Sequence, residues 1–241
     1  MFTGLVQSVA KVTGVSQVDG GVQFTLQCHH DFYQGLGFGA DVIIDGVRFM
    51  VVDCLDNDSA VFELLSADFY STILCLCDIG SIVHVSLAEE SQQDDKIRLL
   101  KGDIDFQSQI IDVSYHEQKY SLMLSFPVAW KRYIFVGGYL AVNGASVTIT
   151  QVDEQEGWFS VHSVMNGARV PLFEHKFSGD SVNIEVIRGS EQAVSALEES
   201  LSEVLGELYP AVGKLLNLQG IDMNYLACRA RAKMLDTLED A

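Results

Sequence analysis

Two hydroxyl side chains, Ser146 and Thr148, stand two residues apart in a stretch that begins with Asn143-Gly144. Side chains alternate between the two faces of a β-strand, so a strand here would carry both hydroxyls on one face. A hydroxyl pair on a mostly apolar wall suits a flat heteroaromatic ring, because apolar surface covers the ring faces while a few polar groups fix the ring edges. In isolation such a pair is more often two ordinary strand residues, so its meaning depends on its surroundings.

The hydroxyl pair lies in one half of an internal duplication. The repeat has an offset of about 98 positions, which is too long for a solenoid repeat and indicates two similar domains. Two similar domains make two similar pockets, and differences between the copies become informative. The matching blocks are residues 38–51 with 136–149, 79–85 with 178–184, and the segment from residue 3 with the segment from residue 101.

Short strands separated by turns fill the first 187 residues. Asp45-Gly46 and Asn143-Gly144 lie between runs of β-branched residues, which is typical of two-residue hairpin loops. Each copy is predicted to hold about six strands in a small barrel or sandwich. We expect all-β domains at residues 1–90 and 97–187, joined by the polar segment 88–96.

Beyond residue 187 the pattern changes to helical spacing. Apolar residues recur every three or four positions in 191–208, and Asp222 is placed to cap a second helix. Residues 188–241 are therefore predicted to form an α-helical extension. An apolar stripe of this kind is most often core or an oligomer interface, so we expect the tail to assemble a homo-oligomer.

Charge and composition limit the possible partners. The chain has 241 residues, 48% hydrophobic, with a net charge of −18, which indicates an acidic globular protein. Such a charge argues against nucleic acid and against anionic membranes. Residues 1–7 lack the features of a signal peptide, and no run of 18 apolar residues occurs, so a cytoplasmic protein is expected. The five cysteines are odd in number, and neither they nor the six histidines show metal-ligand spacing, so we expect no metal.

The opening Met1-Phe2-Thr3-Gly4-Leu5-Val6-Gln7, together with the two spaced hairpins and Val182–Val186, resembles the riboflavin synthase family, which includes lumazine protein. The resemblance covers roughly residues 1–200. It implies two tandem six-stranded antiparallel Greek-key barrels and a C-terminal helix that assembles a homotrimer. The family enzyme converts two molecules of 6,7-dimethyl-8-ribityllumazine into riboflavin and a pyrimidine, with no metal or organic cofactor.

Carried over position by position, the resemblance implies a pteridine-type ligand in the second copy. Gly167 replaces an expected threonine and Gly137 stands where the family often has lysine, so this pocket is trimmed but retained. Residues of the N-terminal segment are expected to lie against the ligand of a partner subunit. The implied ligand-binding residues are Asn143, Gly144, Ser146, Val147, Thr148, Val164 and Gly167, and the implied partner contacts are Gly4, Leu5 and Val6.

The first copy departs further from the family pattern. Arg48 replaces a small hydroxyl or nucleophilic residue, and Met50 replaces a threonine, so a large cation is added and a hydrogen-bonding group is lost. Asp68 stands near another lost threonine. Arg48 would suit a phosphate, as in FMN, better than an uncharged lumazine. The degenerate site is expected to comprise Arg48, Phe49, Met50, Lys101, Gly102 and Asp103.

Two family histidines between the domains are replaced here by Arg98 and Asp103. The synthase reaction needs proton transfers, for which groups that titrate near neutrality are suited. Arg98 cannot act as a base, and Asp103 could do so only if its pKa were raised.

Three hypotheses follow from these positions. The first is a protein that binds lumazine, riboflavin or FMN in the C-terminal barrel and is catalytically impaired. The second is an active, divergent riboflavin synthase, since bringing two bound substrates together can supply much of a rate. The third is a ligand-free interaction scaffold that works through its helical tail.

Overall fold

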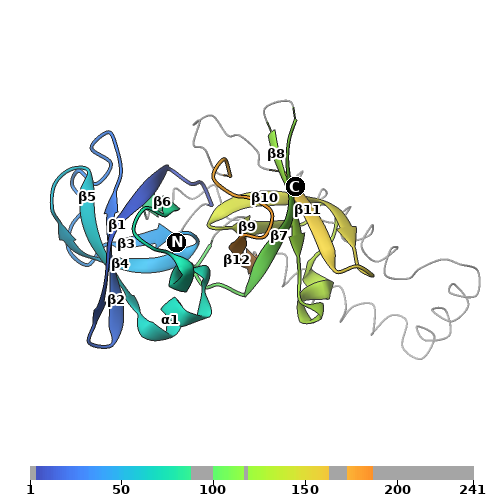
Figure 1. Ribbon diagram of the computed structural model, residues 1–241, viewed down its shortest axis with the longest axis horizontal. Helices are drawn as coiled ribbons and strands as arrows, with labels where there is room; N and C mark the ends of the chain where they lie inside the picture. Colours follow the sequence, from blue (N-terminus) through green and yellow to red (C-terminus); the bar gives the residue numbers. More distant parts are fainter. Residues whose placement is uncertain (1–3, 88–99, 117–118, 163–172, 187–241) are drawn as a thin grey trace, which may run out of the picture.

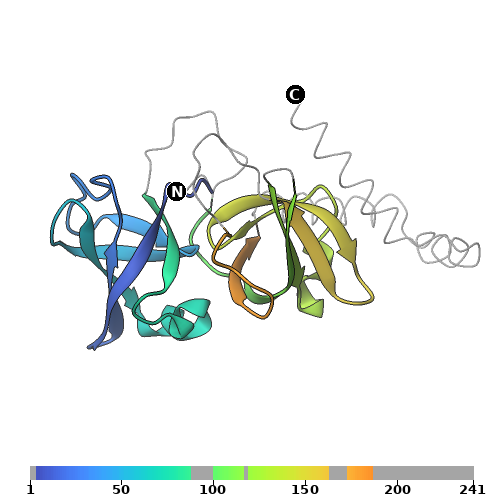
Figure 2. The same ribbon diagram turned by 45° about the horizontal axis from the view of Figure 1, so that its top comes forward.

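The chain folds into two β-barrels that lie side by side (Figures 1 and 2). A computed structural model describes residues 4–87, 100–116, 119–162 and 173–186. The predicted helical tail and the predicted linker lie outside these residues. Within them, no helix is long and apolar enough to cross a membrane.

Each barrel has six antiparallel strands, as the sequence predicts. The strand order β1-β2-β5-β4-β3-β6 closes through the pairing of β1 with β6, and β7 to β12 repeat the same order in the second barrel. The first barrel is built from β1 (Ser8–Val18), β2 (Gly21–Gln27), β3 (Asp41–Ile44), β4 (Val47–Cys54), β5 (Ser59–Leu65) and β6 (Ile82–Leu87). The second is built from β7 (Phe106–His116), β8 (Lys119–Ser125), β9 (Tyr139–Val142), β10 (Ala145–Asp153), β11 (Trp158–His162) and β12 (Ser181–Val186).

The two predicted hairpins connect β3 to β4 and β9 to β10. Asp45 and Gly46 have φ angles of 46° and 84°, and Asn143 and Gly144 have 48° and 78°. Two consecutive residues with positive φ form the type I′ turn, whose twist matches that of the flanking strands. This turn fixes the register of each hairpin, and therefore which residues stand opposite one another.

The interior of each barrel is a separate apolar core. Alternate residues of the strands point inward, and this alternation gives β2, for example, buried Val22, Phe24 and Leu26. Short helices close one end of each barrel: α1 (Ser66–Ser71) and the 3-10 helix η1 (Ile73–Leu76) in the first, and the 3-10 helix η2 (Val128–Tyr133) in the second. Side chains therefore fill the interiors of both barrels.

Candidate functional site

Thr148 and Ser146 of β10 lie on the outer face of the second barrel. Both are half-buried, whereas Val147 and Ile149 between and after them are each only 1% exposed and belong to the barrel core. The sequence-based expectation that the two hydroxyls share one face is met by this arrangement. The side chain of Val147 points the other way, into the core, so it cannot line a site beside the hydroxyls.

The N-terminal segment of the chain crosses over to cover Ser146. The backbone N–H of Ser146 donates a hydrogen bond to the carbonyl oxygen of Gly4 over 2.8 Å. Gly4 has a φ of +73°, and a Cβ atom added to it would lie 2.8 Å from the Cβ of Ser146. Only glycine therefore fits at this contact. The expected contacts of Gly4, Leu5 and Val6 to a partner subunit stay a prediction, while Gly4 contacts the hydroxyl strand of its own chain.

The segment that leads into the second barrel makes the equivalent crossing to the first. Arg48 of β4 donates its backbone N–H to the carbonyl oxygen of Gly102 over 3.3 Å. Gly102 has a φ of +83°, and an added Cβ would lie 2.9 Å from the Cβ of Arg48. The structure thus brings together Arg48 and Gly102, as the sequence comparison implied. We call residues 4–6 and 101–103 the lead-in segments.

At the first barrel the side chains differ from those at the second. The guanidinium of Arg48 forms an ion pair with the carboxylate of Asp41, and this hydrogen bond and the nearby charge raise the pKa of Arg48. Met50 is 43% exposed on the same face, while Phe49 is buried in the core and so is not part of the site. Because Arg48 already has a carboxylate partner, the prediction that it receives a phosphate is weakened.

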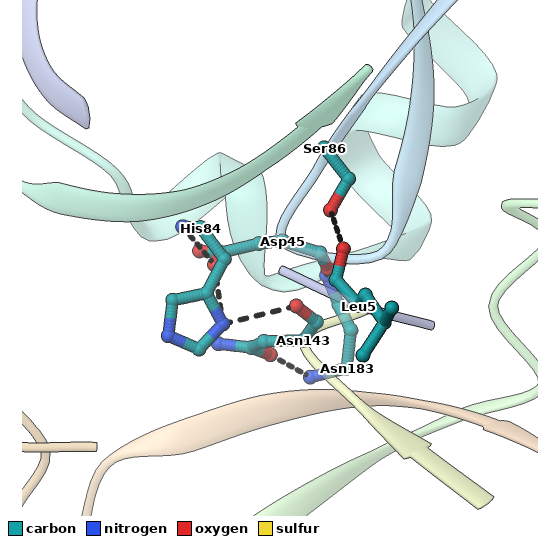
Figure 3. Close-up of polar contacts among 6 residues, drawn as sticks. All are labelled: Leu5, Asp45, His84, Ser86, Asn143 and Asn183. Atoms are coloured by element: carbon teal, nitrogen blue, oxygen red, sulfur yellow. Dashed lines mark hydrogen bonds and ion pairs between the residues drawn. The ribbon is translucent and has the colours of Figure 1, made fainter. Parts of the chain in front are cut away.

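Four buried polar residues join the two barrels where the hairpin turns meet (Figure 3). His84 donates its backbone N–H to Asp45 Oδ1 over 2.9 Å, and Asn183 does the same to Asn143 Oδ1 over 2.8 Å. Across the junction, His84 Nδ1 lies 3.1 Å from the carbonyl oxygen of Asn143, and Asn183 Nδ2 donates to the carbonyl of Asp45 over 2.9 Å. We call these four residues the seam.

Asn143 and Gly144 were expected to bind ligand, but the structure places them in this seam. The side chain of Asn143 is fully buried there. A Cβ on Gly144 would lie 3.1 Å from the backbone nitrogen of Gly46, so the two turns touch. Their side-chain and backbone contacts hold the two turns together, and the expectation that they bind ligand stays a prediction.

Two side chains next to the seam hold the lead-in segments. Ser86 of β6 donates its hydroxyl to the carbonyl oxygen of Leu5 over 3.0 Å (Figure 3). Glu185 of β12 occupies the equivalent place and accepts the backbone N–H groups of Lys101, over 2.7 Å, and Gly102, over 3.1 Å. Burial raises the pKa of Glu185 to about 7, against the opposing effect of these two hydrogen bonds.

Other predicted site residues are not gathered here. Val164, Gly167 and Arg98 lie outside the described residues. Asp68 is exposed on α1, and Asp103 is exposed beside Gly102. In the described part of the chain, no group of three or more His, Cys, Asp or Glu side chains is arranged to hold a metal ion.

Two residues of the site escaped the sequence analysis. Asp41 is placed near Arg48 by the hairpin register, which pairs Asp41 with Met50 and Ile43 with Arg48. That register could have been counted outward from the Asp45-Gly46 turn. Glu185 could have been noted because it replaces Ser86 of the first copy.

Two closed barrels of the same strand order, each crossed by the lead-in segment of the other, define the class of duplicated-barrel proteins. A family profile described as the lumazine binding domain matches residues 101–187. Riboflavin synthase from Escherichia coli strain K12 is 23% identical over 203 residues, which cover 84% of this chain and 94% of that enzyme. Riboflavin synthase from Meyerozyma guilliermondii is 26% identical over 238 residues, which cover 90% and 95%. Over most of its length the chain is thus similar to riboflavin synthases, and its second barrel matches the lumazine binding domain.

Solved structures of a second protein share the fold. The crystal structure of LumP complexed with riboflavin superposes with a TM-score of 0.69 at 18% identity and covers 78% of this chain and all of LumP. LumP complexed with 6,7-dimethyl-8-(1'-D-ribityl) lumazine gives a TM-score of 0.67 at the same identity, covering 78% of this chain and 99% of LumP. At this identity the likeness establishes the fold.

Proposed function

We propose that this protein binds a lumazine- or flavin-type ligand on the outer face of the C-terminal barrel, at Ser146 and Thr148, and has lost riboflavin synthase turnover. The observation that carries the proposal is the contrast between two equivalent places on one duplicated fold. At one place a hydroxyl pair lies beneath a glycine, and at the other an arginine is ion-paired to an aspartate beside a methionine.

The C-terminal face has the properties that a flat ring requires. Gly4 brings backbone close to β10 without a side chain. Leu5 is 49% exposed next to this contact and offers apolar surface. Apolar cover with a few fixed polar groups is the usual composition of a ligand site. That LumP has been crystallised with a lumazine, with riboflavin and with flavin mononucleotide supports this ligand class.

The first barrel argues against turnover. The family reaction consumes two lumazine molecules, so it needs two competent sites. Arg48, ion-paired with Asp41, adds bulk where the family has a small residue. Met50 removes a hydrogen-bonding group where the family has a threonine. Asp103, which stands in place of a family histidine, is exposed to water rather than enclosed beside a reacting ring.

We further propose a cytoplasmic homo-oligomer, a homotrimer by family likeness, that binds neither nucleic acid nor membrane.

Mixing the purified protein with 6,7-dimethyl-8-ribityllumazine tests both parts of this proposal. Ligand fluorescence should change with a defined stoichiometry, and no riboflavin should accumulate. Formation of riboflavin would establish the alternative, an active synthase. No binding of lumazine, riboflavin or FMN would favour the other alternative, a scaffold without ligand.

A variant pair locates the site. Ser146→Ala with Thr148→Ala removes two hydrogen-bonding groups and should weaken binding about 5- to 160-fold, at roughly 0.5–1.5 kcal/mol for each bond. The matched control is Thr13→Ala with Ser16→Ala, which removes two exposed strand hydroxyls from β1 of the first barrel. The control should bind as the native protein does. Equal affinity for all three proteins would place the ligand elsewhere.

A further inference from the structure

Thr148 has an imidazole on one neighbouring strand and a phenol on the other. His162 of β11 and Tyr139 of β9 both pair directly with Thr148. Residues directly opposite in an antiparallel pair carry their side chains to the same face. The next pair along, Ile149 with Val161, is buried in the core, so the row Tyr139–Thr148–His162 faces outward.

The row lies within reach of a single ring. Opposed residues are about 4.5–5.5 Å apart between Cα atoms, so one fused-ring ligand over Thr148 would extend to both neighbours. His162 is exposed and Tyr139 is half-buried. The pairing of β10 with β11 shifts between Ile149 and Gln151, so this alignment of facing side chains does not continue along the two strands past Ile149.

The first barrel has the same row with different chemistry. Met50 pairs with Asp41 on β3 and with Glu63 on β5. Two carboxylates thus stand where the second barrel has a phenol and an imidazole. Asp41 is held by Arg48, and Glu63 accepts a hydrogen bond from Gln23 Nε2 over 2.8 Å. A carboxylate offers only acceptor oxygens, whereas a neutral imidazole can also donate from a ring N–H.

We infer that His162 is a specificity-determining residue of the C-terminal site, where it donates a hydrogen bond to the carbonyl-bearing edge of a fused-ring dione. Glu63 at the equivalent place in the first barrel cannot donate to those oxygens, because a carboxylate is only an acceptor. The inference rests on the proposed function and adds which edge of the ligand is read, and by which side chain.

Substitutions at His162 test this role by titration of riboflavin and 6,7-dimethyl-8-ribityllumazine, followed by fluorescence. His162→Ala should weaken binding about 3- to 10-fold, the effect of one neutral hydrogen bond. His162→Gln keeps an N–H donor and should recover most of the loss. His162→Glu copies the first barrel, lacks the N–H donor and should not recover the loss. His175→Ala, which removes another exposed histidine, is the control and should leave affinity unchanged.

The outcomes separate this inference from the proposed function. If the native protein binds ligand and His162→Ala binds equally well, the role of His162 is refuted while the proposed function stands. If His162→Glu binds as tightly as the native protein, the donor role assigned to His162 is wrong. If the native protein binds neither ligand, both proposals fall. A merely structural role for His162 would make the glutamine variant as weak as alanine and would lower the melting temperature of both.

Discussion

Replacing Glu185 with glutamine should remove a pH dependence from the stability of this protein. Glu185 is only 3% exposed, and burial raises its pKa from an ordinary value of 4.5 to about 7. The nearby carboxylates of Asp105 and Asp103 add to that rise, while the N–H groups of Lys101 and Gly102 oppose it. Between pH 4.5 and about 7 the folded chain therefore holds a proton that the unfolded chain has released.

The sign of the effect follows from this difference in bound protons. The contribution of Glu185 to stability is fully present below pH 4.5, falls as the pH rises, and stops changing above about pH 7. One unit of pKa corresponds to about 1.36 kcal/mol, so the contribution lost between pH 5 and pH 8 is roughly 2–3 kcal/mol. Other carboxylates that are stabilised by folding act in the opposite direction, so the comparison between native and variant profiles is the informative quantity.

Urea unfolding at several values between pH 5 and pH 8, followed by circular dichroism, measures both profiles. At pH 5, Glu185→Gln should be less stable than the native protein. Glutamine there replaces a protonated acid, and its amide leaves one of the two N–H groups without a good acceptor. The deficit should shrink or reverse by pH 8. Glu156→Gln, which removes an exposed carboxylate, should follow the native profile. Parallel profiles for native and Glu185→Gln would refute the reasoning, because they would mean that the two N–H groups keep Glu185 ionised throughout.

Three further substitutions have defined outcomes. Gly4→Ala should lower the free energy of unfolding by about 1–2 kcal/mol because of its positive φ, with a further loss from the clash with Ser146, and should weaken ligand binding. Gly35 also has a positive φ, +80°, but has open space around it, so Gly35→Ala should show the backbone cost alone in thermal unfolding. Asn183→Ala leaves the N–H of Ile73 and the carbonyl of Asp45 without their side-chain partner, so urea unfolding should reveal a loss of about 2–4 kcal/mol. Arg48→Ser with Met50→Thr and Glu63→His copies the second barrel, and calorimetric titration should then detect a second ligand per chain; an unchanged stoichiometry would mean that other features close the first site.

The sequence predicted the barrels well because their cause is local. Asp45-Gly46 and Asn143-Gly144 adopt the positive φ angles that a two-residue hairpin requires, and the alternation of apolar and polar residues fixes the faces of each strand. The same alternation assigned Ser146 and Thr148 to one face. It also assigns Val147 to the core, whereas the family motif had grouped Val147 with the two hydroxyls.

The contacts between the barrels could not be predicted in this way. Gly4 touching Ser146, and Gly102 touching Arg48, depend on how two folded domains are placed, and no local propensity encodes that placement. The hydrogen bonds of the seam could not be predicted for the same reason. Asn143 matched a binding motif in sequence, yet its side-chain Oδ1 accepts the backbone N–H of Asn183 at the junction. Nothing in the spacing of these residues distinguishes a ligand contact from a contact between domains.

The duplication supplies a comparison within one molecule that separates structural from functional residues. Where the two copies keep the same hydrogen bonds with different side chains, as Asp45 with His84 and Asn143 with Asn183 do, the geometry is what the fold requires. Where the backbone contact is kept but the outward-facing side chain changes character, as from Arg48 to Ser146, the fold makes no such demand. Under the proposed function these positions differ because only the second barrel receives the ligand, so the outward row, rather than the seam, is the place to test for ligand recognition.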